Sequence, residues 1–167
     1  MIVTRRGAKE AMPSFKPLDP NFKRRVQDAL GRQKVMRTLG IEIAALKAGE
    51  ITLTMPYVES YTQQHDFVHA GVVAIALDNA CGGAAFSLMP AEADILTVEF
   101  KLNLLAPARG DRFVFKGKVV KPGRTITVCE SQAFAIRGSE EKLIATMSGT
   151  LMALLEQPGI RARPDAV

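Results

Sequence analysis

The sequence predicts an α+β domain in which a strongly curved antiparallel sheet covers a central helix. Apolar residues run through positions 69–88 without a polar face, which is typical of a helix buried on nearly all sides. Alternating apolar and polar residues predict two strands before this helix and four after it. This order lacks the regular alternation of strands and helices that parallel crossover folds require.

A first helix is predicted between Pro20 and Gly40. Apolar residues recur there at helical spacing, and the lysines and arginines lie mostly on the opposite face. Asp19 or Asn21 could cap its amino end, Pro20 suits its first turn, and Gly40 could end it. We expect residues 1–19 to form a flexible lead-in, residues 20–157 a single domain, and residues 158–167 a frayed tail.

Six strands are expected, at residues 41–45, 51–55, 95–105, 112–120, 125–137 and 142–155. A turn at Ala48-Gly49 joins the first two strands, and a polar loop at 57–68 leads into the central helix. Gly82 and Gly83 each cost that helix about 1 kcal/mol relative to alanine, so they indicate a close approach near its end. A second copy of the fold is expected to cover what one sheet leaves open.

The composition is that of one soluble globular domain, with 167 residues, 47% hydrophobic and 23% charged. The net charge of +5 could attract phosphates, but a solvated helix face explains it better. No nucleic-acid partner is expected, since tryptophan is absent and basic residues do not group with aromatics. An acid inside the most apolar segment argues against a membrane span, and the charged amino terminus argues against a signal peptide. The protein is therefore expected to be cytoplasmic, with reduced thiols.

Asp78 is the strongest chemical feature of the sequence. It lies in the middle of the apolar helix, where a carboxylate is costly unless it has partners or is protonated. Acids in such surroundings are more often functional than structural; pairing with a backbone group, or with an arginine across an interface, is the structural alternative. Gly71, Ile75 and Gly82 share its helical face, and a slot lined by glycine and an acid suits a thin ligand arm.

A second group of candidates precedes the helix. The first N–H groups of a helix have no internal partner and lie at the positive end of its dipole, so the amides of Ala70 and Gly71 could hold an oxyanion. His69 could cap this end or take part in chemistry. Gln63 could polarise a carbonyl or simply face water. His65 and His69 do not predict a metal site, because no cysteine or carboxylate cluster completes it.

Other catalytic patterns are missing from the sequence. No serine stands in a G-x-S-x-G nucleophile elbow, and neither Cys81 nor Cys129 has a base beside it. No glycine-rich phosphate loop occurs. No metal or cofactor is therefore expected.

The run from Gln63 through His69-Ala70-Gly71 to Asp78-Asn79 resembles the active-site segment of hotdog-fold thioesterases of the phenylacetyl-CoA type. That pattern has a loop Asn or Gln, then His-Gly-Gly, then Asp or Glu nine residues after the histidine. Segments 97–107, 123–125 and 145–150 also fit, and the resemblance covers about residues 38–155. It implies a hotdog fold, with about six strands around the long helix and an extra N-terminal helix.

The resemblance further implies an enzyme that hydrolyses acyl-CoA thioesters to a free acid and coenzyme A. Asp78 would be its general base or its nucleophile, acting across a subunit interface. The N–H of Ala70, and secondarily that of Gly71, would form the oxyanion hole. Gln63 would bind the thioester carbonyl or orient water, and His69 would position this loop.

Four further residues are candidates for substrate binding. By resemblance, Thr97 would lie near the acyl group and Arg124 would contact the phosphates of coenzyme A. Gly82 and Asn79 would lie beside the carboxylate. The resemblance implies a homodimer or a dimer of dimers, that is a homotetramer, with active sites at subunit interfaces. Ala70 departs from the glycine of the family pattern; it keeps the amide donor and narrows the slot.

Two other functions remain open. One is a hotdog protein that binds acyl-CoA, or acts as a dehydratase, without hydrolysing thioesters. A dehydratase would use His69 as a base paired with Asp78 of the partner helix, and turnover of enoyl or 3-hydroxyacyl thioesters would identify it. A nucleic-acid-binding regulator would use the basic first helix; no motif supports it, and salt-dependent binding to DNA would revive it. The sequence leaves short aliphatic, medium-chain and aryl acyl groups open.

Overall fold

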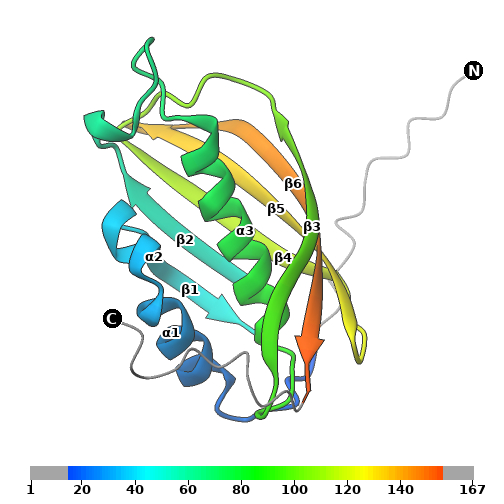
Figure 1. The fold of residues 1–167 in the computed structure, drawn as a ribbon. Coiled ribbons are helices and arrows are strands. Elements are labelled where there is room, and N and C mark those ends of the chain that lie inside the picture. Colours follow the sequence, from blue (N-terminus) through cyan, green and yellow to red (C-terminus); the bar gives the residue numbers. More distant parts are fainter. Residues whose placement is uncertain (1–14, 156–167) are drawn as a thin grey trace, which may run out of the picture.

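In the computed structural model, which describes residues 15–155, a curved antiparallel sheet wraps around one long helix (Figure 1). The sheet has six strands in the order β1-β2-β4-β5-β6-β3. The strands are β1 (Glu42–Lys47), β2 (Glu50–Pro56), β3 (Asp94–Leu104), β4 (Arg112–Lys121), β5 (Ile126–Arg137) and β6 (Glu140–Leu154), and the helices are α1 (Phe22–Arg32), α2 (Lys34–Leu39) and α3 (Ala70–Phe86). The predicted α+β architecture is confirmed. Most of the predicted lead-in and the whole predicted tail lie outside the described residues.

Helix α3 lies deep in the concave face of the sheet. Gly117 on β4 allows this depth, because a Cβ there would lie 2.2 Å from the carbonyl oxygen of Ala80. Ser131 on β5 is buried and donates a hydrogen bond of 3.1 Å to the carbonyl of Leu77. The residue before Asp78 is thereby tied to the sheet, so the sheet fixes the height of the carboxylate along the helix axis.

The prediction of a single helix between Pro20 and Gly40 is wrong at Gln33. The backbone there is extended, with ψ at 113°, and it separates α1 from α2. This break changes the direction of the chain, so that Met36 and Leu39 of α2 still reach the core. The predicted end is confirmed, because Gly40 adopts the left-handed conformation that glycine favours, at φ 64°.

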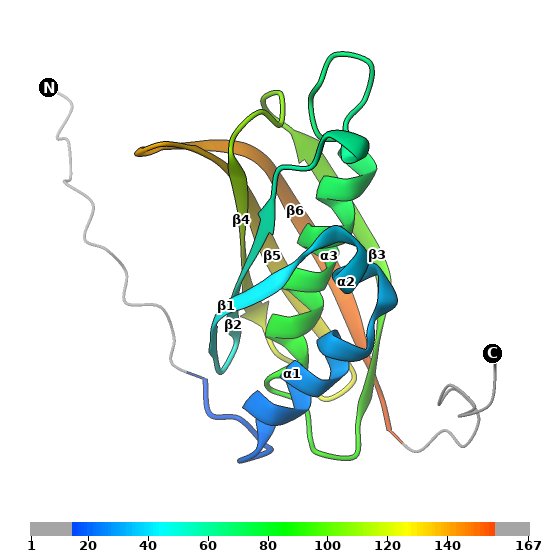
Figure 2. The ribbon, with the colours of Figure 1, turned by 90° about the vertical axis from the view of Figure 1, so that its left-hand side faces the viewer.

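Arg25 fastens α1 to the carboxyl end of α3, and Figure 2 shows α1 beside that end of the helix. Its guanidinium donates to the carbonyls of Phe86 and Met89 at 3.1 and 2.7 Å. It also pairs with the buried carboxylate of Asp19 at 2.8 Å and stacks over the Phe86 ring. A positive charge suits this end of a helix. The side chain thus holds α1 in one place against α3.

Strand β3 forms one edge of the sheet and presents apolar side chains to solvent. Val98, Phe100 and Leu104 are 55%, 45% and 56% exposed. One stripe of α3 faces the same opening, with Gly71 exposed and Ile75 and Asp78 half-buried. The central helix is therefore covered on nearly every side but not on this one, and the stripe predicted from helical spacing is the part left accessible.

Candidate functional site

The amino end of α3 holds the first group of candidate residues. The His69 imidazole caps the helix, since its Nδ1 accepts a hydrogen bond of 3.0 Å from the N–H of Gly71. The amides of Val72 and Val73 donate to the carbonyl of His69. Among the described residues the N–H of Ala70 has no such acceptor. Of the two predicted oxyanion donors, Ala70 is therefore the available one, and Gly71 is engaged by the cap.

Gln63 is held at the base of the loop before α3. Its backbone N–H donates to the carbonyl of Phe67 at 2.9 Å, and a bridge pairs Thr62 with Val68. Its side-chain Oε1 accepts a hydrogen bond from the N–H of His65. With the oxygen occupied, the Nε2 amide is the end of the side chain left to donate to a ligand.

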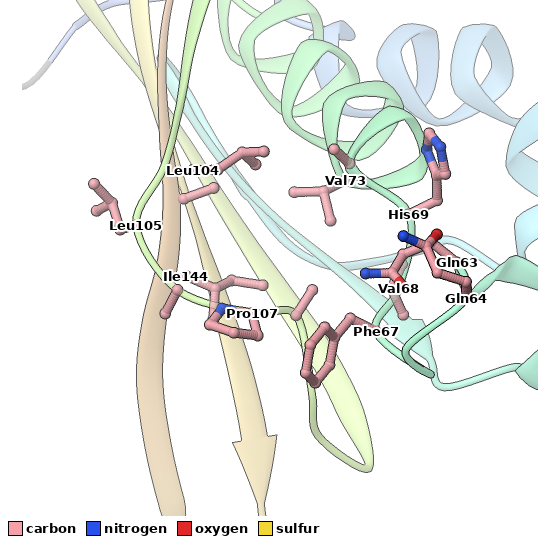
Figure 3. A pocket seen from close by; sticks show the side chains of 14 residues that line it. Gln63, Gln64, Phe67, Val68, His69, Val73, Leu104, Leu105, Pro107 and Ile144 are labelled. Carbon is pink, nitrogen blue, oxygen red and sulfur yellow. The ribbon is translucent and has the colours of Figure 1, made fainter.

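A cavity of about 520 Å³ opens at this end of the helix. Gln63, Gln64, His69 and Ala70 form one side, and Figure 3 shows the two glutamines and the histidine gathered there. The rest of the lining is apolar, from Phe67, Val68, Val73, Leu104, Leu105, Ala106, Pro107, Ala108, Ile144 and Ala145. The cavity thus combines an apolar channel with hydrogen-bond donors at one wall.

Asp78 lies in a second cavity, of about 120 Å³, between α1, α3 and β3. Thr97 on β3 donates a hydrogen bond of 2.8 Å from Oγ1 to Oδ1 of Asp78. Burial raises the pKa of this carboxyl above its usual value, and the Thr97 bond offsets part of that rise. Asn79 and Gly82 also line the cavity, and the amide of Asn79 donates back to the carbonyl of Ile75. Four predicted site residues therefore lie together here.

The two cavities are separate within one chain. Ala70 and Asp78 are eight residues apart on α3, which corresponds to about 12 Å along the helix axis, and no residue lines both cavities. The predicted donors and the predicted carboxylate thus form two half-sites. We call them the donor half-site (Gln63, His69, Ala70) and the carboxylate half-site (Asp78, Thr97).

Arg124 lies at neither half-site of its own chain. It lines a cavity of about 390 Å³ together with Lys16, Leu88 and Met89, where β4 turns into β5 beside the carboxyl end of α3. Sequence reasoning missed a different basic group, formed by Arg109, Arg137 and Lys142 around a cavity of about 310 Å³. Arg109 comes from the loop before β4, whereas Arg137 and Lys142 come from the adjoining ends of β5 and β6, where Glu140 also lines the cavity, so no local pattern predicts this group.

The second basic cavity is next to the donor half-site, because Phe67 and Pro107 line both.

The described residues contain no group of three or more His, Cys, Asp or Glu side chains placed to hold a metal. No helix in residues 15–155 is long and apolar enough to cross a membrane. Burial raises the pKa of Cys81 to about 11 and that of Cys129 further still, so neither buried thiol is a ready nucleophile.

Comparison with known proteins places the chain in a family. A model described as the thioesterase superfamily matches residues 65–142. A "putative esterase" of Saccharolobus solfataricus is 31% identical over 97 residues, which cover 58% of this chain and 69% of that protein. Another, from Halobacterium salinarum, is 31% identical over 110 residues, which cover 63% of this chain and 72% of that protein. The chain belongs to the thioesterase superfamily.

Solved structures agree with this assignment. A thioesterase family protein from Silicibacter pomeroyi is 56% identical, with a TM-score of 0.80 over 81% of this chain and 99% of that one. A Haemophilus influenzae thioesterase is 22% identical, with a TM-score of 0.70 over 78% of this chain and 88% of that one. The PaaI protein of the E. coli phenylacetic acid degradation operon is 18% identical, with a TM-score of 0.73 over 82% and 96%. The hotdog fold is confirmed; the phenylacetyl-CoA type stays a prediction.

Proposed function

We propose that this protein is a cytoplasmic acyl-CoA thioesterase whose active site is shared between two copies of the chain. Residues 20–157 would form its single catalytic domain. The observation behind the shared site is the separation of the two half-sites. One provides the free backbone amide at the helix end without a carboxylate, and the other provides a half-buried carboxylate at mid-helix, away from that amide. Thioester hydrolysis needs both, so a second chain has to complete each site.

The donor half-site suits the thioester carbonyl. As the carbonyl carbon is attacked, negative charge develops on its oxygen, and the free N–H of Ala70 at the positive end of α3 stabilises that charge. The Nε2 amide of Gln63 adds a second donor. His69 acts as a capping residue that fixes the direction of the first turn. Because its Nδ1 accepts from Gly71, this role favours a hydrolase over a dehydratase that would need the histidine as its base.

The carboxylate half-site of the other chain supplies the proton acceptor. In one route, Asp78 takes a proton from water, the hydroxide attacks the carbonyl, and the sulfur of coenzyme A leaves with the proton. In the other, Asp78 attacks the carbonyl carbon, the C–S bond breaks as the thiolate of coenzyme A leaves, and water hydrolyses the resulting mixed anhydride, which frees Asp78 and supplies the proton of the thiol. Burial favours both routes, since it raises the basicity of the carboxylate. The free acid and coenzyme A are the products either way.

The edge strand β3 is the surface on which we place the second chain. A long, exposed, apolar edge is rarely left unpaired in a soluble protein, and Phe100 and Leu104 extend the open side of α3. Leu96 on β3 and Ile126 on β5 are both in register with Met152 of β6, and the three lie on the outer face of the sheet. This second apolar patch would join two dimers into the predicted homotetramer.

Arg124 is our proposed contact for the phosphates of coenzyme A. Its cavity contains a second cation, Lys16, and is rimmed by apolar residues that suit the adenine or the pantetheine arm. A planar guanidinium binds phosphate through paired hydrogen bonds. This role requires the association of the two chains to place the Arg124 cavity of one of them within the length of a coenzyme A molecule from the shared active site.

A mixing experiment tests the shared site. Chains with Asp78→Asn and chains with Gln63→Ala are each expected to be nearly inactive alone when thiol release from acyl-CoA is followed. If they are unfolded and refolded together, half of the dimers combine the two variants, and each mixed dimer has one intact site. About a quarter of the wild-type activity should therefore return. A site built within one chain cannot recover in this way, so activity that stays at the level of the separate variants contradicts the proposal.

A further inference from the structure

We infer that α1 closes the acyl end of the carboxylate half-site and restricts the enzyme to acyl groups of about the volume of one aromatic ring. This inference rests on the proposed function and names its substrate class. It comes from the shape and lining of the Asp78 cavity, from the way α1 is fixed, and from the open space beside Gly82.

The Asp78 cavity has a mixed lining. Asp78 and Thr97, which are joined by a hydrogen bond, line it beside Asn79, and the reacting carbonyl would lie next to this pair. Helix α1 contributes Val26, Ala29 and Leu30, with Gln33 just after it, and Phe86 and Ile95 add further apolar surface. An acyl group whose carbonyl meets the carboxylate therefore points its tail toward α1.

The volume of the cavity decides what fits. An apolar cavity of about 150 Å³ holds one benzene molecule, and this one measures about 120 Å³. A single ring, or a straight chain of about five or six carbons, fills it. A two-carbon acyl group leaves most of it empty, and a sixteen-carbon chain far exceeds its volume.

The wall formed by α1 is held in place. Arg25 lies one residue before Val26 and bonds to the carbonyls of Phe86 and Met89 at 3.1 and 2.7 Å. It also forms a buried ion pair with Asp19. A helix fastened by this many partly buried hydrogen bonds does not swing aside at low cost, so the wall that α1 contributes to the cavity is fixed.

Gly82 keeps the cavity open at the level of the carboxylate. A Cβ at Gly82 would meet no atom within 4 Å, whereas one at the neighbouring Gly83 would lie 2.7 Å from Ile51. Gly83 is therefore needed for packing between α3 and β2. At Gly82 the missing side chain leaves room beside Asp78, and a methyl group there would occupy substrate space without a clash.

The test measures two quantities for a series of ligands. The first is kcat/KM for thiol release from acetyl-, hexanoyl-, benzoyl- and palmitoyl-CoA. The second is Kd for non-hydrolysable S-ethyl-, S-hexyl-, S-benzyl- and S-hexadecyl-CoA thioethers, which reports on the cavity whether or not turnover occurs. We expect kcat/KM to rise and Kd to fall about fourfold for each methylene added from two carbons to about six. Hexadecyl should bind at least 10-fold more weakly than hexyl.

Two variants and their controls assign the limit to this cavity. Ala29→Leu narrows it from α1 and should weaken S-hexyl- and S-benzyl-CoA binding by about 10-fold or more, with S-ethyl-CoA nearly unchanged. Gln27→Leu, on the exposed side of α1, should change none of them. Gly82→Ala should act in the same direction as Ala29→Leu, and Gly31→Ala, where a Cβ also meets nothing within 4 Å, is its matched control.

The outcomes separate this inference from the proposed function. If no thioester is hydrolysed while the thioether series follows the expected order, the proposed activity fails and the cavity assignment stands. If thioesters are hydrolysed but S-hexadecyl-CoA binds as well as S-hexyl-CoA, the size limit is wrong. The assignment to α1 is wrong if Ala29→Leu weakens all ligands equally, or weakens none.

Discussion

The two half-sites differ in nearly every physical respect although both belong to α3. The donor half-site lies at the helix end, beside an exposed loop, and opens into about 520 Å³. The carboxylate half-site lies at mid-helix, walled by α1 and β3, and encloses about 120 Å³. One provides amide hydrogens at the positive end of a dipole, and the other provides a half-buried anion. A chain that offers both to a partner gains two complete sites from one symmetric contact.

The difference also assigns parts of the substrate. Under the proposed function, the large apolar cavity would take a long flexible arm such as pantetheine and the small cavity the acyl group. The thioester would then lie where the two meet. The variants below each change one half-site or one basic cavity, so they test whether these regions have separate roles.

Asp78→Asn should have the largest effect. The asparagine keeps the shape and can still accept the Thr97 hydrogen bond through Oδ1, but it cannot take a proton or attack. We expect kcat to fall by about 10²–10⁴, the range typical for loss of a general base, while KM changes little. Thiol release under saturating acyl-CoA measures it, and near-wild-type turnover would falsify the catalytic role.

The melting temperature of the same Asp78→Asn preparation distinguishes catalysis from structure. Burial raises the pKa of Asp78 in the folded protein, so the stability that the carboxyl contributes is present below the unfolded pKa and lost as pH rises through the folded pKa. At pH 7 the ionised group is therefore a cost to folding. The variant should melt slightly higher than wild type at pH 7. A marked drop in Tm would mean that Asp78 has a structural role.

Arg124→Ala should have a smaller effect, confined to binding. Phosphate contacts persist from the ground state to the transition state, so KM should rise about 10-fold while kcat stays nearly constant. Arg109→Ala, in the basic cavity next to the donor half-site, is the comparison. If Arg109→Ala raises KM and Arg124→Ala does not, the phosphates bind beside Phe67 and Pro107 instead.

Sequence reasoning predicted the parts of each half-site better than their arrangement. The absence of a polar face at 69–88 predicted α3, and the carboxylate among small residues predicted an accessible stripe at Gly71, Ile75, Asp78 and Gly82. These features depend on helical periodicity, which is local. Local position also places Asn79 and Gly82 beside Asp78, because one is the next residue and the other lies one helical turn later.

Features that depend on tertiary contacts could not be predicted in the same way. The break at Gln33 follows from how α2 turns onto the core, and apolar periodicity alone continues through it. The role of α1 as a wall depends on Arg25 meeting carbonyls more than 60 residues away. Gly83 was expected to allow a close approach and does so against Ile51, but Gly82, which looks the same in sequence, faces open space.

The pH dependence should show the smallest effect and tests the environment of Asp78 directly. The reaction needs the ionised carboxylate, and burial raises its pKa above the ordinary value of 3.8, so kcat/KM should fall with decreasing pH around a midpoint above that value. Thr97→Val removes the hydrogen bond that lowers this pKa, and the midpoint should move to still higher pH. Thr54→Val, on β2 and away from both half-sites, is the control and should leave the profile unchanged. Because the donor half-site contains no carboxylate, Gln63→Ala should lower the whole profile without moving its midpoint. If Thr97→Val lowers activity equally at all pH values, the hydrogen bond does not act on a titrating base.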